Sequence, residues 1–247
     1  MVFEKLAEIV EIQVEYESKS SLAIQAGREE GLSAVEQPVV KIGGTPVIPG
    51  STLKGVLRSF LESYLSQNGL EICVPLAAIP GEIKRSNKIG EYVQKIGRKS
   101  PCEGEKACPV CQIFGSAGIS SRTSFLDARP INEVKILDRK HVALERDTKT
   151  ASKGALLEIQ TIEPGAKFNG LIRIINPEKW HIGALIIAIE NLEKLGMGSK
   201  KSAGYGEIVT EVIKITTKKM ENGEWQEIQV TKEEYRDAFL KYLRDNQ

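Results

Sequence analysis

The chain has 247 residues, of which 41% are hydrophobic and 27% are charged, and its 34 basic and 33 acidic side chains leave a formal net charge of +1. This composition is that of a globular chain with one domain or two small ones, and it excludes collagen-like, coiled-coil and disordered proteins. The longest apolar run, 182–189, is too short for a membrane span of roughly 20 residues, and acids interrupt the first 16 residues where a signal peptide would be apolar, so we expect a cytoplasmic protein without membrane contacts.

The first 70 residues contain one strand and one helix with clear patterns. Apolar and polar residues alternate over 10–16, which predicts a strand with one buried face, and Leu22 and Ile24 continue this period as a partner strand. A helix is predicted from Ser51, a residue type that caps helices, to Asn68-Gly69, where glycine favours a helix end. Its apolar residues form one stripe at helical spacing: Leu53, Leu57, Phe60, Leu61, Tyr64 and Leu65.

Residues 70–121 have no regular pattern. They contain four prolines and all four cysteines, and between residues 83 and 99 there are six lysine or arginine residues against one acid. We interpret this region as a loop-rich insertion.

The rest of the chain predicts alternating strands and helices. Strands are predicted over 156–162, 168–175 and 207–216, with weaker patterns over 125–138 and 141–145 and a hairpin tip at 147–153. Residues 180–195 predict a helix that is apolar almost all round, and a T-x-x-E capping box begins a helix over 231–245. Two β-α-β units can be drawn from this order. We therefore expect an α+β, ferredoxin-like sheet with helices on one face and an open face that binds a ligand.

The cysteines have the spacing of metal ligands. Cys102, Cys108 and Cys111 can share one tetrahedral zinc ion, and the fourth ligand is Cys73 or, as second choice, His141. Four protein ligands would make the zinc structural. The alternatives are buried free cysteines and a thioredoxin-like redox pair, and the pair is disfavoured because Cys-Pro-Val-Cys does not follow a strand and begin an obvious helix.

Two further segments could bind an anion. The glycine-rich stretch 196–206 carries Lys200 and Lys201 and could cradle phosphates, or it could be a solvent-exposed loop. Lys54 and Arg58 lie four residues apart after the predicted helix start, where they could hold consecutive phosphates or simply form a solvated helix face.

Taken together, the segments IPGSTLKGVLRSFLE, CPVCQIFG and GMGSKKSAGYGEI resemble the signature of the RAMP superfamily. More closely, they are similar to the repeated backbone subunit of type III CRISPR–Cas effector complexes, over about residues 22–209. The resemblance implies a single RAMP domain over 1–247, a modified RNA-recognition-motif fold with a zinc-binding insertion at 70–121. It also implies a protruding thumb at 132–160, whose tip would carry Arg139, Lys140, Arg146, Lys149 and Lys153.

The resemblance further implies the partners. Copies of the chain would stack head to tail along CRISPR RNA, with other subunits and with target RNA. The residues expected to contact RNA are Ser51, Lys54, Arg58, Arg122, Arg139, Lys140, Gly196, Gly198, Lys200, Lys201 and Gly204.

Catalysis is left open by the sequence. In relatives that cut target RNA, an aspartate precedes a Pro-Val pair, and Glu36 stands at its place here. Glu36 could still bind Mg²⁺ or Mn²⁺, but an extra methylene displaces its carboxylate. The other hypotheses are a metal-independent endonuclease that processes CRISPR RNA precursors through histidine or tyrosine, and a zinc-stapled interaction module that does not bind RNA.

Overall fold

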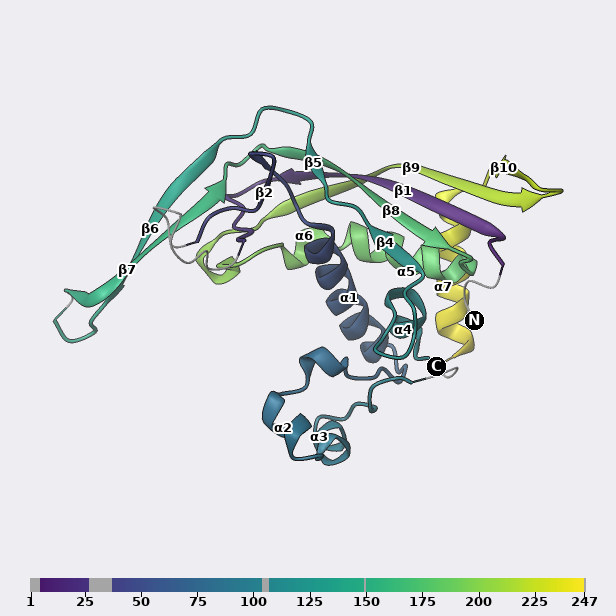
Figure 1. Cartoon of the computed structure of the whole chain (residues 1–247), viewed down its shortest axis with the longest axis horizontal. Coiled ribbons are helices and arrows are strands. Elements are labelled where there is room, and N and C mark those ends of the chain that lie inside the picture. The colour runs from purple at the N-terminus through teal and green to yellow at the C-terminus, as the bar shows by residue number, and fades with distance from the viewer. Residues whose placement is uncertain (1–4, 27–36, 104–106, 149, 247) are drawn as a thin grey trace.

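The computed structural model describes residues 5–26, 37–103, 107–148 and 150–246 (Figure 1). Its main sheet has six antiparallel strands in the order β10-β9-β1-β8-β4, with β5 also pairing with β8. These strands are β1 (Glu8–Ser18), β4 (Thr123–Phe125), β5 (Arg129–Pro130), β8 (Lys167–Ile175), β9 (Ile208–Glu221) and β10 (Glu224–Ile228). The main helices are α1 (Gly50–Gln67), α5 (Lys179–Glu190), α6 (Leu192–Leu195) and α7 (Lys232–Asp245).

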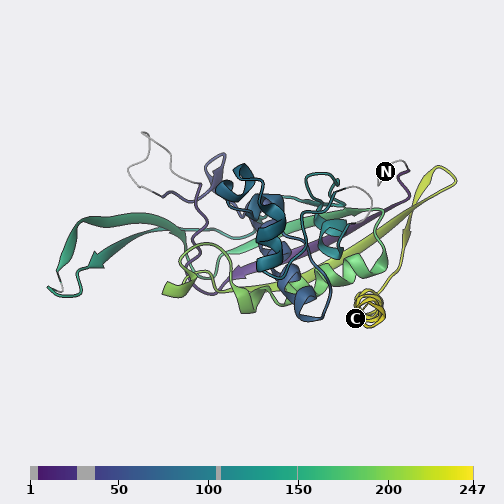
Figure 2. The same ribbon diagram turned by 90° about the horizontal axis from the view of Figure 1, so that it is seen from below.

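The sheet order confirms the ferredoxin-like prediction. The units β1-α1-β4 and β8-α5-β9 interleave, so that β1 and β8 are central and β9 and β4 flank them. Figure 2 shows α1 and α5 against the same side of this sheet. The strand β10 extends the sheet beyond this core and was missed in the sequence, because none of its residues is buried.

The alternation of β1 explains why the helices cover one face. Val10, Ile12, Val14 and Tyr16 are fully buried, and they join the leucine stripe of α1 and the apolar residues of α5 in one core. The helix α5 is buried on all sides, and Gly183 allows α7 to cross it closely, since a Cβ there would lie 2.0 Å from the carbonyl oxygen of Tyr235. The predicted helix over 180–195 is in fact divided at Asn191 into α5 and α6.

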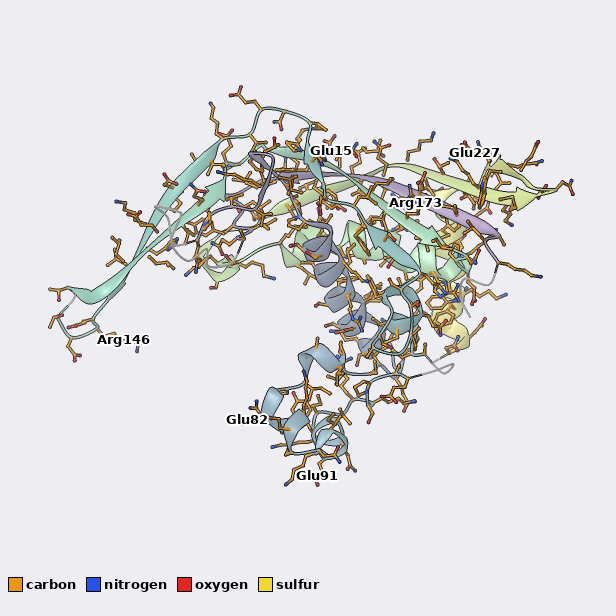
Figure 3. All side chains as sticks on the ribbon, in the orientation of Figure 1. Glu15, Glu82, Glu91, Arg146, Arg173 and Glu227 are labelled. Carbon is orange, nitrogen blue, oxygen red and sulfur yellow. The ribbon has the colours of Figure 1, made fainter. Side chains whose placement is uncertain are left out.

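The other face of the sheet is polar and carries carboxylates along its central strand. Glu11 pairs with Arg173 at 2.7 Å, and Glu15 pairs with Lys167 at 2.8 Å. Figure 3 shows Glu15 and Arg173 projecting on the side away from α1. These ion pairs neutralise the basic side chains of β8, so this face does not have the strongly positive character that we expected of a polyanion-binding surface.

Two segments project from this domain. One is the two-stranded ribbon β6 (Ile136–Leu144) and β7 (Ala151–Ile162), which extends away from the sheet and covers the segment expected to form the thumb, a name that we keep for it (Figure 1). The insertion, described as loop-rich in the sequence, contains short helices: η1 (Leu76–Ala78), α2 (Gly81–Arg85), α3 (Ile89–Lys95) and α4 (Pro109–Phe114). Val74, Ile79 and Val93 form a small apolar cluster separate from the main core.

The remaining short elements are β2 (Lys41–Ile42), β3 (Thr45–Pro46) and η2 (Lys201–Ala203). The prediction of a partner strand at Leu22 and Ile24 was wrong. Leu22 forms an isolated bridge with Ile162 and thereby holds the base of the thumb. Within the described residues, no helix combines the length and the apolar character that a membrane span requires.

Candidate metal centre and RNA-binding residues

Cys73, Cys102, Cys108 and Cys111 form one cluster whose sulfur atoms all lie within 4.8 Å of one another. The sulfur of Cys73 is 3.4 Å from that of Cys111 and 3.7 Å from that of Cys108. Four sulfurs around one zinc at a Zn–S distance of 2.3 Å would be roughly 3.8 Å apart, so the donor set fits a tetrahedral metal. The four cysteines could therefore hold a metal such as zinc. His141 lies on β6, outside this cluster, so Cys73 is the fourth member.

The short helix α4 brings two of the cysteines into position. Cys108 is its N-cap residue and Pro109 occupies its first turn, so that Cys111 lies one turn further along on the same side. Cys-Pro-Val-Cys therefore does begin a short helix, contrary to the prediction, although no strand directly precedes it among the described residues. A cysteine at a helix start can be redox-active, but two additional sulfurs within 4.8 Å favour a metal centre over a dithiol pair.

The cysteines of the cluster shift one another's pKa values. Side-chain hydrogen bonds with Cys111 and Cys73 lower the pKa of Cys108, and the bonds with Cys108 raise the pKa of Cys111 and raise that of Cys73 to about 12. One thiolate is therefore stabilised by its neighbours while other protons stay on sulfur. A divalent cation displaces such protons when it binds.

The side chain of Arg58 contacts this cluster. Its Nη2 lies 3.7 Å from the sulfur of Cys111, its Nη1 donates to the carbonyl oxygen of Gly115 at 3.0 Å, and its Nε donates to Glu62 at 2.9 Å. The arginine supplies a positive charge where four thiolates and a divalent metal would leave a formal charge of −2. All three nitrogens of the guanidinium have partners, which argues against the expected grip on phosphates.

Lys54 faces a cavity of about 710 Å³ between α1 and the insertion. Its ammonium group donates to the hydroxyl of Ser121 at 3.1 Å, and burial, with Arg58 nearby, lowers its pKa. Lys84 of α2 also lines the cavity, and no carboxylate is among the lining residues that the structure describes. Lys54 and Lys84 can therefore meet an anion at the mouth of this cavity.

The start of α1 differs from the prediction. The helix begins at Gly50, its N-cap residue is Pro49, and Ser51 is an exposed residue of the first turn rather than a cap. The backbone N–H of Gly50 donates to the carboxylate of Asp127 at 2.8 Å. Because Asp127 already supplies an anion at this helix end, the helix dipole contributes less to phosphate binding than expected.

The glycine-rich loop packs tightly onto the segment after β1. Ser199 N–H donates to the carbonyl oxygen of Ala23, and Gly206 N–H donates to that of Ser21. A Cβ at Gly198 would lie 2.5 Å from the Ala23 oxygen, and Gly196 has a positive φ of 65°. These two glycines therefore shape the loop rather than cradle phosphates.

The exposed part of the loop is its basic turn. Lys201 and Gly204 are exposed, and Lys200 is half-buried with a left-handed φ of 59°. Lys201 lines a second cavity along α1, which includes Gly55 and Ser59 but neither Lys54 nor Arg58. Lys54 and Lys201, both expected to contact RNA, thus lie on different sides of α1.

The remaining cations have separate positions. Arg139 and Lys140 are exposed in the first half of β6, nearer the base of the thumb than its tip, and Lys140 pairs with Glu158 at 2.9 Å. Arg146 is at the far end of the ribbon (Figure 3). Arg122 donates to the carbonyl oxygen of Asn176, which gives it a structural role at the end of β8.

Two of the expected residues lie outside the described residues, and the side chain of a third, Lys153, is not described. Glu36, the candidate catalytic carboxylate, lies outside the described residues. The same is true of Lys149, expected at the thumb tip.

A family model described as the RAMP superfamily matches residues 15–209, which is most of the chain. The chain belongs to the RAMP superfamily. Membership supports a CRISPR-associated RNA-binding role in general for this RAMP chain. No curated protein matches it.

The sequence did not reveal several residues of the RAMP chain's candidate site. Asp127, Ser121 and Lys84 reach α1 from distant segments, and no local pattern connects them with it. Glu62 could have been found, because it follows Arg58 by four residues on the same helix and such pairs attract each other.

Proposed function

We propose that this chain is a backbone subunit that stacks along CRISPR RNA in a type III effector complex and holds the guide–target duplex by its backbone. The family match over residues 15–209 carries this proposal. The ribbon that extends from a ferredoxin-like sheet supports it, because it corresponds to the thumb that separates base pairs in such subunits. A subunit of this kind reads shape and phosphates and needs no base-reading pocket.

The contacts with RNA come from cations that have no carboxylate partner among the described residues. Lys200 and Lys201 serve from the glycine-rich loop, Lys54 from α1 and Arg139 from the thumb. The basic side chains Arg173 and Lys167 on the open face of the sheet are already paired with Glu11 and Glu15, so we expect the RNA strand on the side of the helices. Neighbouring copies of the chain cover other surfaces by head-to-tail contacts, which do not close into a ring.

Zinc is the metal that we assign to the four cysteines. Thiolate ligands at these separations suit zinc, and a site with four protein ligands is structural. Both ends of the insertion join the main core, through its cysteines and through Leu70, Ile72, Val110, Ile113 and Phe114. The middle of the insertion, 74–99, has only the small apolar cluster of Val74, Ile79 and Val93. Zinc therefore supplies much of the energy that folds this region.

RNA binding tests the proposal. The purified chain should bind labelled single-stranded RNA with little sequence preference, and its affinity should fall steeply between 50 and 200 mM salt because counterions are released from phosphates. Replacing Lys200 and Lys201 together by alanine should weaken binding, and Lys241→Ala, on exposed α7, should not. If the wild-type chain binds RNA no better than albumin at low salt, the proposal fails.

One observation favours a second candidate, the processing of CRISPR RNA precursors. Nε2 of His141 on the thumb lies 3.3 Å from the hydroxyl of Tyr205 in the glycine-rich loop. A histidine beside a tyrosine could move protons during attack by a ribose 2′-hydroxyl, without a metal. Cleavage of repeat RNA in chelator, abolished by His141→Ala, would establish this activity, and uncleaved RNA would exclude it.

A further inference from the structure

A second cavity, of about 530 Å³, runs along α1 on the side that does not carry Lys54. We call it the α1 groove. It is lined by Gly55, Val56, Ser59, Phe60, Ser63, Tyr64 and Gln67 of α1, together with Lys194, Leu195 and Lys201. Its volume lies in the ~300–1,000 Å³ range of small-molecule sites. Neither the metal centre nor the thumb uses this groove.

The floor of the α1 groove is aromatic. The rings of Phe60 and Tyr64 stack with centroids 5.5 Å apart and planes 20° apart, and Tyr64 is held from behind by Phe239 of α7, with centroids 6.2 Å apart. The sequence placed both rings in the core stripe of α1. The leucines of that stripe are buried, but Phe60 and Tyr64 remain only half-buried. Aromatic surface is thus presented to the groove.

The rim of the α1 groove is cationic. Lys194 comes from α6 and Lys201 from the glycine-rich loop, and both are exposed. Lys194 donates to the side chain of Asn191 at 2.9 Å, so its charge is not neutralised. Among the lining residues that belong to the described part of the chain, none carries a carboxylate. The groove therefore suits a ligand that combines a flat ring with negative charge.

We propose that the α1 groove binds a nucleotide unit of single-stranded RNA, with its base against Phe60 and Tyr64 and its phosphates at Lys194 and Lys201. Bases stack on aromatic side chains regardless of sequence, while cations follow the backbone. An acidic peptide would satisfy the lysines but not the aromatic floor, and an apolar helix would leave the lysines without partners. This inference rests on the proposed function, because Lys201 belongs to the basic turn that contacts the guide.

The test compares RNA with a strand that lacks bases. Fluorescence anisotropy would measure the binding of a labelled octauridylate and of an abasic strand with the same phosphate number to the full-length chain. Tyr64→Leu and Phe60→Leu keep apolar volume and remove the ring. Each should weaken octauridylate binding about tenfold, which corresponds to about 1.4 kcal/mol, and should leave binding of the abasic strand within twofold.

Matched controls separate stacking from folding. Tyr92→Leu removes a half-buried ring in the insertion and should leave both affinities unchanged. Lys194→Ala changes an exposed residue without disturbing the core, and it should weaken the binding of octauridylate and of the abasic strand about equally. Lys241→Ala should weaken the binding of neither strand.

The outcomes distinguish the two proposals. If both leucine variants bind octauridylate as tightly as the wild type, the groove is not a stacking site and the proposed function stands. Equal weakening of the abasic strand by the leucine variants would also overturn the stacking site. Binding of free uridine monophosphate as tight as that of the octamer would overturn the assignment to a strand. If the wild-type chain binds no RNA, the proposed function itself fails.

Discussion

Arg58 provides the sharpest test of how α1 and the cysteine cluster depend on each other. Its guanidinium links Glu62, the carbonyl oxygen of Gly115 and the sulfur of Cys111. In the zinc-bound state it would offset part of the −2 charge on the cluster and donate to a ligand sulfur. Arg58→Ala removes this charge and this donor and leaves the four ligands in place.

The expected loss follows from the role of residues that contact metal ligands. Removing such a partner typically lowers metal affinity by about 10–100-fold, which corresponds to about 1.4–2.7 kcal/mol. We expect Arg58→Ala to lie within this range, because the side chain is half-buried and its interaction with sulfur is only partly screened by water. Arg58→Lys keeps the positive charge but loses the planar guanidinium with its several N–H donors, so the zinc affinity of this variant should be intermediate.

The assay is competition for zinc with a chromogenic chelator, followed by the rate of zinc release. Arg98→Ala is the matched control, because Arg98 donates to the backbone of Glu62 at 3.5 Å and joins the insertion to α1 without a contact to sulfur. Equal zinc affinity in Arg58→Ala and the wild type would refute the reasoning, as would an equal loss in Arg98→Ala. In the zinc-loaded state Arg58→Ala should bind RNA within about twofold of the wild type, and a large loss would show that Arg58 contacts phosphate after all.

Three further predictions concern the fold. Removing zinc with a chelator, or Cys108→Ser, should accelerate hydrogen exchange over 74–99 and leave β1 protected, because residues 74–99 have only a small apolar cluster of their own. Unchanged exchange over 74–99 would contradict a structural role for zinc. Gly183→Ala should cost about 1–3 kcal/mol and lower Tm by about 2–4 °C for each kcal/mol, because its Cβ meets the Tyr235 oxygen, whereas Gly90→Ala on α3 has open space and should not destabilise the protein. Burial, and Arg122 to a lesser degree, lower the pKa of His181 from 6.5 to about 3, so the neutral imidazole contributes stability above pH 6.5 that is lost as the pH falls. Chemical unfolding should therefore show that the difference in free energy of unfolding between the wild type and His181→Asn shrinks by up to about 1.4 kcal/mol per pH unit below pH 6.5. A difference that stays constant with pH would refute this role of His181.

The architecture could be predicted because its signals are local. The period of two in β1, the leucine stripe of α1 and the capping box of α7, where Thr231 accepts from the N–H of Glu234, each determine an element from neighbouring residues. The order of these elements then restricts the sheet to a few topologies. The proximity of the four cysteines followed in the same way from spacing and residue type.

The candidate site was less predictable because it depends on contacts between distant segments. Spacing correctly placed Lys54 and Arg58 on one side of α1, but it could not tell which neighbour that side meets. The start of α1 was misplaced because the N-cap is Pro49 and the first helical residue is Gly50, which fits against the backbone of Phe125 where a Cβ would clash. The helix α4 was missed because six residues are too few for a periodic signal.

The ribbon of β6 and β7 has one more consequence. Among the described residues, its strands bridge to the rest of the chain near the base, where Ile162 meets Leu22 and Ile159 meets Gln37, and elsewhere they pair with each other. Inserting or deleting two residues in each strand would keep every side chain on its original face and would change the reach of the ribbon by about 7 Å. The length of the ribbon can therefore change by steps of two residues in each strand while the domain that carries it stays the same.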